Sequence, residues 1–125
     1  MRSLPHDHGH GADAFHERIP SVEDFATLAD IYKLLGDAGR IRIFWLLCHC
    51  EECVTNLAAL VEMSSPALSH HLRQLKAGGL VTSRREGKEV YYRAADTAQA
   101  RLLHQMIETL VEIACPDAPK GKKEP

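Results

Sequence analysis

The chain has 125 residues, enough for one domain with terminal arms and a modest hydrophobic core. Its composition, 45% hydrophobic and 26% charged, is typical of a soluble globular protein. No apolar run reaches the length of a membrane span and the start lacks a signal-peptide core, so we expect a cytoplasmic protein without membrane contact. Because thiols stay reduced in that compartment, we do not expect the 4 Cys to form structural disulfides. They are expected to serve as metal ligands, as redox groups or as buried packing residues.

The charge is unevenly distributed, although the net charge of −2 argues against a generally basic nucleic-acid binder. Basic residues dominate between Met63 and Arg93, whereas acidic residues dominate the segment before residue 31. A basic patch on an acidic body suits a protein that binds phosphates with one face.

Residues 1–20 lack hydrophobic periodicity and are rich in histidine, so we expect a flexible arm. Its histidines are either metal ligands or solvated tail residues. Three helices should follow, over residues 21–35, 38–47 and 54–62. Ser21 and Asp24 form an acidic variant of the capping box at the start of the first. The apolar residues of the second, Trp45 among them, should be mostly buried, and those of the third (Leu57, Leu60 and Val61) should face the core.

The stretch from Met63 to Leu80 predicts the second helix of a helix-turn-helix. Ser65 is the expected N-cap, and Pro66 suits the first helical position. Leu68, Leu72 and Leu75 share one face at helical spacing, so that face should pack inward. The opposite face carries small and polar side chains that can contact bases and phosphates. Gly78 and Gly79 should end the helix.

Two strand-like runs follow, LVTSRR and EVYYRA, joined by a turn at Glu86–Lys88. A basic hairpin directly after a helix-turn-helix predicts a wing that grips backbone phosphates. A last helix, capped by Asp96 or Thr97, should run to Cys115, and its apolar residues are too many for one narrow stripe. That excess predicts a partner subunit. Residues 116–125 read as a disordered tail.

The predicted order of elements resembles the ArsR/SmtB family of metal-responsive winged-helix repressors. The resemblance rests on GDAGRIRIFWLL, CVTNLAAL, SSPALSHHLRQLKAGGLV and GKEVYYRAAD, and covers roughly residues 22–113. It implies a mainly α fold with a small β-hairpin, a homodimeric winged helix-turn-helix within residues 21–115. It also implies a repressor, not an enzyme, that binds double-stranded operator DNA and releases it when an effector binds.

By this resemblance, the DNA-binding residues lie on the predicted recognition helix and in the wing. The base-contacting candidates are Ser65, Ala67, Ser69, His70 and His71, with Ser64 and Gln74 beside them. Arg73, Arg84, Arg85 and Lys88 would hold phosphates.

The main candidate for the effector site is the cysteine cluster Cys48, Cys50 and Cys53, within CHCEEC. By the resemblance, Cys53 falls on a cysteine that thiolate-type members use. We expect a turn between the second and third helices, in which three thiols can converge on Zn, Cd, Pb, As(III) or Cu(I). Further ligands could be His49, the arm residues His6, His8 and His10, or Cys115.

A second family site is only half matched here, by Asp96 and Glu112. The stripe formed by His104, Glu108 and Glu112 could be a relocated site or simply the polar face of a helix. Three alternatives stay open from the sequence alone: buried cysteines with a packing role, a redox or persulfide switch on the same thiols, and a winged-helix interaction module that binds no DNA.

Overall fold

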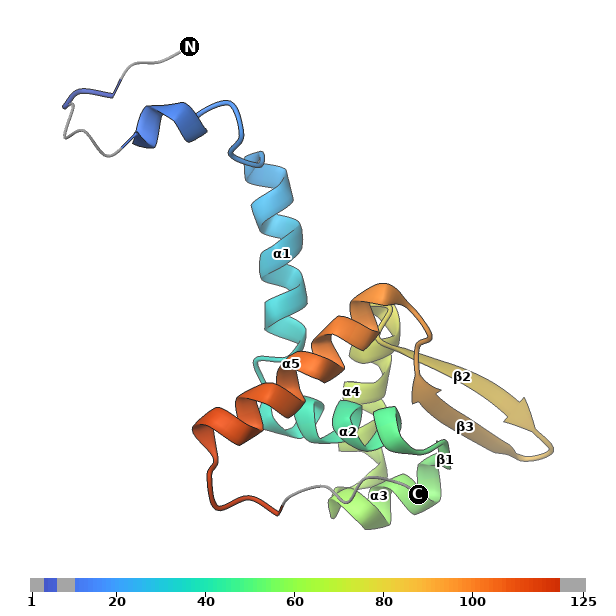
Figure 1. Cartoon of the computed structure of the whole chain (residues 1–125). Coiled ribbons are helices and arrows are strands. Elements are labelled where there is room, and N and C mark those ends of the chain that lie inside the picture. Colours follow the sequence, from blue (N-terminus) through green and yellow to red (C-terminus); the bar gives the residue numbers. More distant parts are fainter. Residues whose placement is uncertain (1–3, 7–10, 120–125) are drawn as a thin grey trace. The chain divides into compact units, whose positions relative to one another are not determined.

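The computed structural model in Figure 1 describes residues 4–6 and 11–119. The chain divides into two compact units, residues 1–33 and 34–125. Within the described residues, no helix combines the length and the apolar character that crossing a membrane requires. His8 and His10, predicted as possible ligands, and the end of the predicted tail (residues 120–125) lie outside the described part.

The first unit contains a short 3-10 helix, η1 (Ala12–Phe15), and most of α1 (Val22–Leu34). The predicted capping box is confirmed, because the Ser21 backbone N–H donates to Asp24 Oδ2 and the Asp24 N–H donates to Ser21 Oγ, both at 3.0 Å. No residue of α1 is buried within the single chain.

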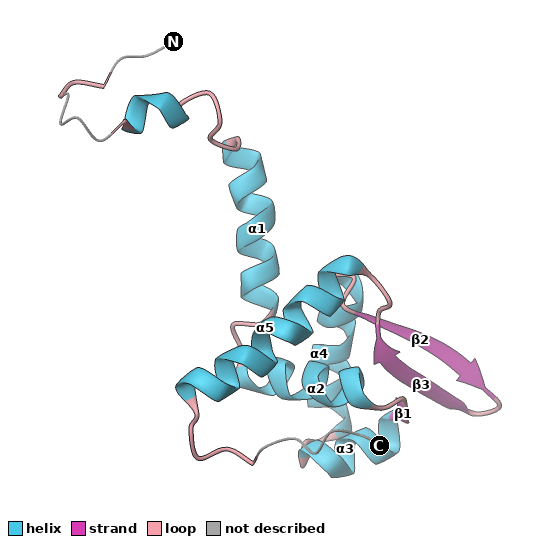
Figure 2. Cartoon of the chain, viewed as in Figure 1, coloured by secondary structure: helices cyan, strands magenta, loops and turns pink. Residues whose placement is uncertain are grey.

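The second unit has the predicted order of helices and hairpin strands, with one short strand in addition, coloured by type in Figure 2. Its elements are α2 (Ala38–His49), β1 (Glu52–Cys53), α3 (Val54–Val61), α4 (Ser65–Ala77), β2 (Val81–Glu86), β3 (Glu89–Ala94) and α5 (Ala98–Ala114). Helices α3 and α4 form the helix-turn-helix, and β2 and β3 form the hairpin that extends from it. The winged helix-turn-helix fold predicted from the sequence is confirmed.

The small sheet has a strand that the sequence analysis missed. Its order is β1-β3-β2, all antiparallel, with Glu52 opposite Tyr92 and Cys53 opposite Tyr91. In the hairpin, Arg84 lies opposite Tyr91 and Glu86 opposite Glu89. The extra strand ties the segment that follows α2 to the base of the wing.

The core confirms the predicted inner face of α4, since Leu68, Leu72 and Leu75 are at most 1% exposed. They pack with apolar side chains from the other elements of the unit, chiefly Ile43, Phe44, Leu47, Leu57, Val61, Leu80 and Val81. Two expectations are wrong: Leu60 is 49% exposed and Trp45 is 37% exposed. Trp45 lies outside the core because its indole N–H bonds a carboxylate of α5.

Two predicted helix boundaries also need correction. Ser64, not Ser65, is the N-cap of α4: its hydroxyl accepts from the Ala67 N–H, and Pro66 follows at the second helical position. Helix α2 continues to His49, two residues beyond the expected end, so Cys48 lies in a helix and not in a turn. As predicted, Thr97 caps α5 and Gly79 adopts a positive φ of 77° after α4.

Candidate nucleic-acid interface and metal centre

The outer face of α4 presents small and basic side chains to solvent. Ser64, Ser65, Ala67, His70 and Arg73 are exposed, and Ser69 is half-buried. The helix begins after a capping serine whose hydroxyl accepts a backbone N–H at 3.3 Å. Polar atoms of this kind, on the solvent-facing side of a helix whose other side packs in the core, can reach base edges in a major groove.

Two other residues predicted to contact DNA face α2 instead. Gln74 Oε1 accepts a hydrogen bond from Arg40 Nη1 at 2.9 Å. His71 is half-buried, with Nε2 at 4.0 Å from Asp37 Oδ1, and its buried Nδ1 has no hydrogen-bond partner within the described part of the chain. In this arrangement, both side chains connect the start of α2 to the recognition helix.

The wing carries three predicted phosphate-binding residues, Arg84, Arg85 and Lys88, and all three are exposed. Arg84 is held by carboxylates: its Nη2 donates to Glu51 Oε1 at 2.7 Å and its Nη1 to Glu86 Oε2 at 2.5 Å. Hydrogen bonding to Arg84 holds the pKa of the Glu51 carboxyl below its usual value. Glu51 therefore competes with phosphate for Arg84, whereas among the described residues Arg85 and Lys88 form no such ion pair.

The three clustered cysteines lie in different surroundings. Cys48 is half-buried in α2, and burial, followed by the nearby Glu108 charge, raises its pKa to about 12. Cys50 is exposed and donates its thiol to the Leu46 carbonyl oxygen at 3.3 Å. Cys53 is buried and caps α3, with its sulfur accepting from the Asn56 N–H at 3.5 Å.

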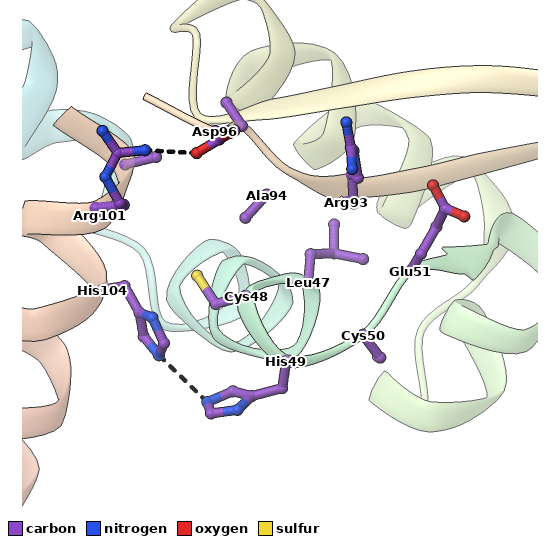
Figure 3. Close-up of a pocket in the computed structure, with 12 residues that line it drawn as sticks. Leu47, Cys48, His49, Cys50, Glu51, Arg93, Ala94, Asp96, Arg101 and His104 are labelled. Carbon is purple, nitrogen blue, oxygen red and sulfur yellow. Dashed lines mark hydrogen bonds and ion pairs between the residues drawn. The ribbon is translucent and has the colours of Figure 1, made fainter. Parts of the chain in front are cut away.

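Figure 3 shows the Cys48 sulfur and the Cys50 side chain pointing away from each other at the end of α2. Burial also raises the pKa of Cys50, so at neutral pH both thiols stay mainly protonated. Among the described residues, the three sulfurs do not belong to a group of side chains at ligand spacing. The cysteine site stays a prediction.

A different group of ligand atoms is brought together between α2 and α5. It consists of His49, His104 and Glu108, whose donor atoms all lie within 4.8 Å of one another; among the described residues, no other group of this kind meets that criterion. Glu108 Oε1 is 3.1 Å from His49 Nε2 and 3.0 Å from His104 Nε2, and the two Nε2 atoms are 3.3 Å apart. Trp45 Nε1 donates to the same carboxylate oxygen at 2.9 Å.

These contacts hold the Glu108 carboxylate in its charged form. Partial burial acts to raise its pKa, but hydrogen bonds from His49, His104 and Trp45 outweigh burial and keep the pKa below its usual value. The three side chains remain partly exposed, at 46% for His49, 30% for His104 and 40% for Glu108. The group is therefore charged, polar and open to solvent on one side.

Beside this group, an open pocket of about 360 Å³ lies between the end of α2 and the junction of β3 with α5. Figure 3 shows Cys48, Arg93 and Arg101 around it, with the His49–His104 contact at its edge. Asp96, which half-matched the second family site, is paired there with Arg101.

Three more of the predicted ligands are among the described residues and are not part of this group. Glu112 is exposed on α5 and is not part of the His49 group, Cys115 is exposed at the end of α5, and His6 is exposed in the first unit. Sequence reasoning considered His104 with Glu108 and His49 with the cysteines, but it did not combine the two sets. A usable signal was present, because Trp45/His49 and His104/Glu108 are both i,i+4 pairs.

Comparison with known proteins gives consistent matches. The sequence model described as "Bacterial regulatory protein, arsR family" matches residues 37–83. A transcriptional repressor SmtB homolog from Synechocystis is 35% identical over 94 residues, covering 75% of this chain and 71% of the relative. A cadmium resistance transcriptional regulatory protein, CadC, from Listeria innocua is 39% identical over 70 residues, covering 55% of this chain and 59% of the relative.

Among solved structures, the chain is similar to a homodimeric winged helix-turn-helix DNA-binding domain from Mycobacterium bovis, described as a possible ArsR-family transcriptional regulator. The TM-score is 0.66 at 28% identity, and the match covers 82% of this chain and 97% of that one. The matches to the SmtB homolog, over 94 residues, and to the Mycobacterium bovis domain, over 82% of this chain, are much longer than the helix-turn-helix.

Proposed function

Because the chain belongs to the arsR family of bacterial regulatory proteins, we propose that it is a homodimeric transcriptional repressor whose affinity for operator DNA is lowered by a bound metal ion. The observation that carries the DNA-binding part is the exposed outer face of α4 next to a basic wing. Arg73, Arg85 and Lys88 are all exposed there, so each protomer offers at least three cations to the phosphate backbone.

The dimer is supported by α5. Leu102, Met106, Leu110 and Ile113 are 60, 37, 55 and 72% exposed in the single chain, and their spacing places them along one side of the helix. An apolar stripe of this length suits a two-fold interface with the same helix of a second copy. Such a dimer presents two recognition helices to half-sites about one helical turn of DNA apart.

A metal effector is supported by the named roles of the relatives and by the donors of this chain. The CadC relative carries cadmium resistance in its name, and the SmtB homolog is named a repressor. This chain offers two imidazoles and a carboxylate already at ligand spacing, and four free thiols. The candidate ions are those predicted from the sequence: Zn, Cd, Pb, As(III) and Cu(I).

The DNA-binding part is tested with a duplex selected by the purified protein from a random-sequence library. Six phosphate contacts per dimer predict a salt slope of about −5, and hence a loss of affinity of about 10³-fold between about 50 and 200 mM salt. A slope near zero, or failure to enrich any sequence, would instead support the interaction module without DNA binding. Adding each candidate ion to the bound complex then shows which one releases DNA.

A further inference from the structure

We propose that His49, His104 and Glu108 form a binding site for a borderline divalent ion, with zinc as the first candidate, and that this site is the one through which metal regulates DNA binding. The regulatory half of this inference rests on the proposed function, whereas the metal site itself does not. It differs from the cysteine site predicted from the sequence in its ligands, its place in the fold and its preferred ions.

The spacing of the three ligand atoms is within a few tenths of an ångström of the edges of a zinc tetrahedron. Zinc binds imidazole nitrogen and carboxylate oxygen at about 2.0–2.2 Å, which places two ligands of a tetrahedral ion about 3.3–3.6 Å apart. The three separations here are 3.3 Å between the histidine nitrogens, and 3.1 and 3.0 Å from these to Glu108 Oε1. An ion can therefore replace the hydrogen bonds of this triangle if Glu108 Oε1 moves away from the two histidine nitrogens by a few tenths of an ångström.

The donor atoms of the three side chains determine which metal ions the site prefers. Two imidazoles and one carboxylate suit Zn(II) and similar first-row ions, whereas As(III), Cd(II) and Pb(II) favour thiolates. The partial exposure of all three side chains leaves room for water as a fourth ligand. Trp45 Nε1, which donates to the ligating oxygen at 2.9 Å, orients the carboxylate as outer partners of metal ligands commonly do.

The position of the site on α2 connects it to both DNA-binding elements. His49 is the last residue of α2, and near the start of the same helix Arg40 bonds Gln74 of the recognition helix. Two residues beyond His49, Glu51 holds Arg84 of the wing. An ion that joins His49 to α5 fixes the end of α2. It thereby also restricts the segment just after α2 that carries Glu51, the partner of Arg84.

The first test measures zinc affinity of the reduced dimer, without DNA, by competition with a chromophoric chelator. We expect one zinc per protomer. H49Q, H104Q and E108Q should each lower zinc affinity by at least about 10–100-fold, because replacing even a residue that only hydrogen-bonds to a metal ligand has an effect of that size. E112Q, an exposed carboxylate one turn further along α5, is the matched control and should bind as the unmodified chain does. Far-UV circular dichroism confirms that each variant is folded.

A second test identifies the ligand type. With Co(II), the site should give visible d–d bands without the near-ultraviolet charge-transfer band of a cobalt thiolate. The C48S/C50S/C53S variant should keep the same spectrum and the same zinc affinity. A thiolate band overturns the inference in favour of the cysteine site. So does a loss of zinc binding in the serine variant together with retained binding in H49Q, H104Q and E108Q.

The two proposals fail separately. If zinc binds as expected but leaves operator affinity unchanged, the metal site stands and its regulatory role is overturned. If the protein enriches no DNA sequence, the proposed function is overturned while the zinc measurements still decide the site. If zinc releases operator DNA from the unmodified dimer, H104Q should require a correspondingly higher zinc concentration and E112Q should not.

Discussion

Glu51 restrains a wing arginine, so we expect its replacement by glutamine to strengthen operator binding. Arg84 donates to Glu51 Oε1 through Nε at 3.1 Å and through Nη2 at 2.7 Å. Both side chains are partly exposed, so the pair can open when DNA supplies a phosphate, but opening costs part of the binding free energy. In E51Q the guanidinium loses this charged partner and keeps only its ion pair with the exposed Glu86, so it is freer to pair with phosphate.

The size of the effect follows from counterion release. Each additional phosphate contact steepens the salt slope by about 0.9, so two freed arginines in a dimer steepen it by about 1.8. Over a fourfold rise in salt this corresponds to a further loss of affinity of about 12-fold. Fluorescence anisotropy of a labelled operator duplex, titrated at several salt concentrations, measures both the affinity and the slope.

The control is E89Q, which removes an exposed carboxylate from the same hairpin, at a position opposite Glu86 rather than beside Arg84. E89Q should tighten operator binding slightly because it removes a negative charge, but it should change the salt slope by less than E51Q does. The double variant E51Q/R84A should lose the gain. Equal slopes for E51Q and E89Q, or a gain that persists without Arg84, would refute the reasoning.

Three further predictions concern stability. T97A should lower the free energy of unfolding by about 0.5–2 kcal/mol in urea denaturation, because Thr97 Oγ1 caps α5 by accepting the Ala100 N–H at 3.1 Å, and T97S should restore most of it. L72A should cost about 2–5 kcal/mol, since Leu72 is 1% exposed and its loss leaves a cavity under the recognition helix; an unchanged thermal midpoint would contradict this packing. The pKa of Asp37 is lowered, chiefly by the hydrogen bond from the Arg40 N–H, so the ionised carboxylate stabilises the folded state at neutral pH. This stabilisation is lost as the pH falls through the lowered pKa. In D37N, the free energy of unfolding measured by urea denaturation should therefore decrease less steeply with falling pH than in the unmodified chain.

The local signals in the sequence were sufficient for most of the fold. Ser21 with Asp24, and Thr97, mark helix starts through bonds that span three residues, and the spacing of Leu68, Leu72 and Leu75 gave the buried face of α4. Strand β1 was missed because a run of two residues carries no periodicity, and its partner in β3 lies about forty residues away.

The candidate metal centre shows where sequence reasoning reaches its limit. The cysteines attracted attention because they are close in sequence, but α2 extends through Cys48 and turns the sulfurs into different surroundings. His49 and Glu108 are 59 positions apart and meet only because α2 packs against α5. Proximity in sequence is a weak guide to a site assembled by tertiary packing.

Thermodynamic coupling between metal and DNA tests the central claim most directly. Zinc affinity is measured for the free dimer and for the dimer saturated with its selected operator, and operator affinity is measured with and without zinc. The account predicts a reduction of about 5–150-fold, equal in both directions because binding free energies are linked. Equal zinc affinities for the free and the operator-bound dimer would contradict a metal-regulated repressor.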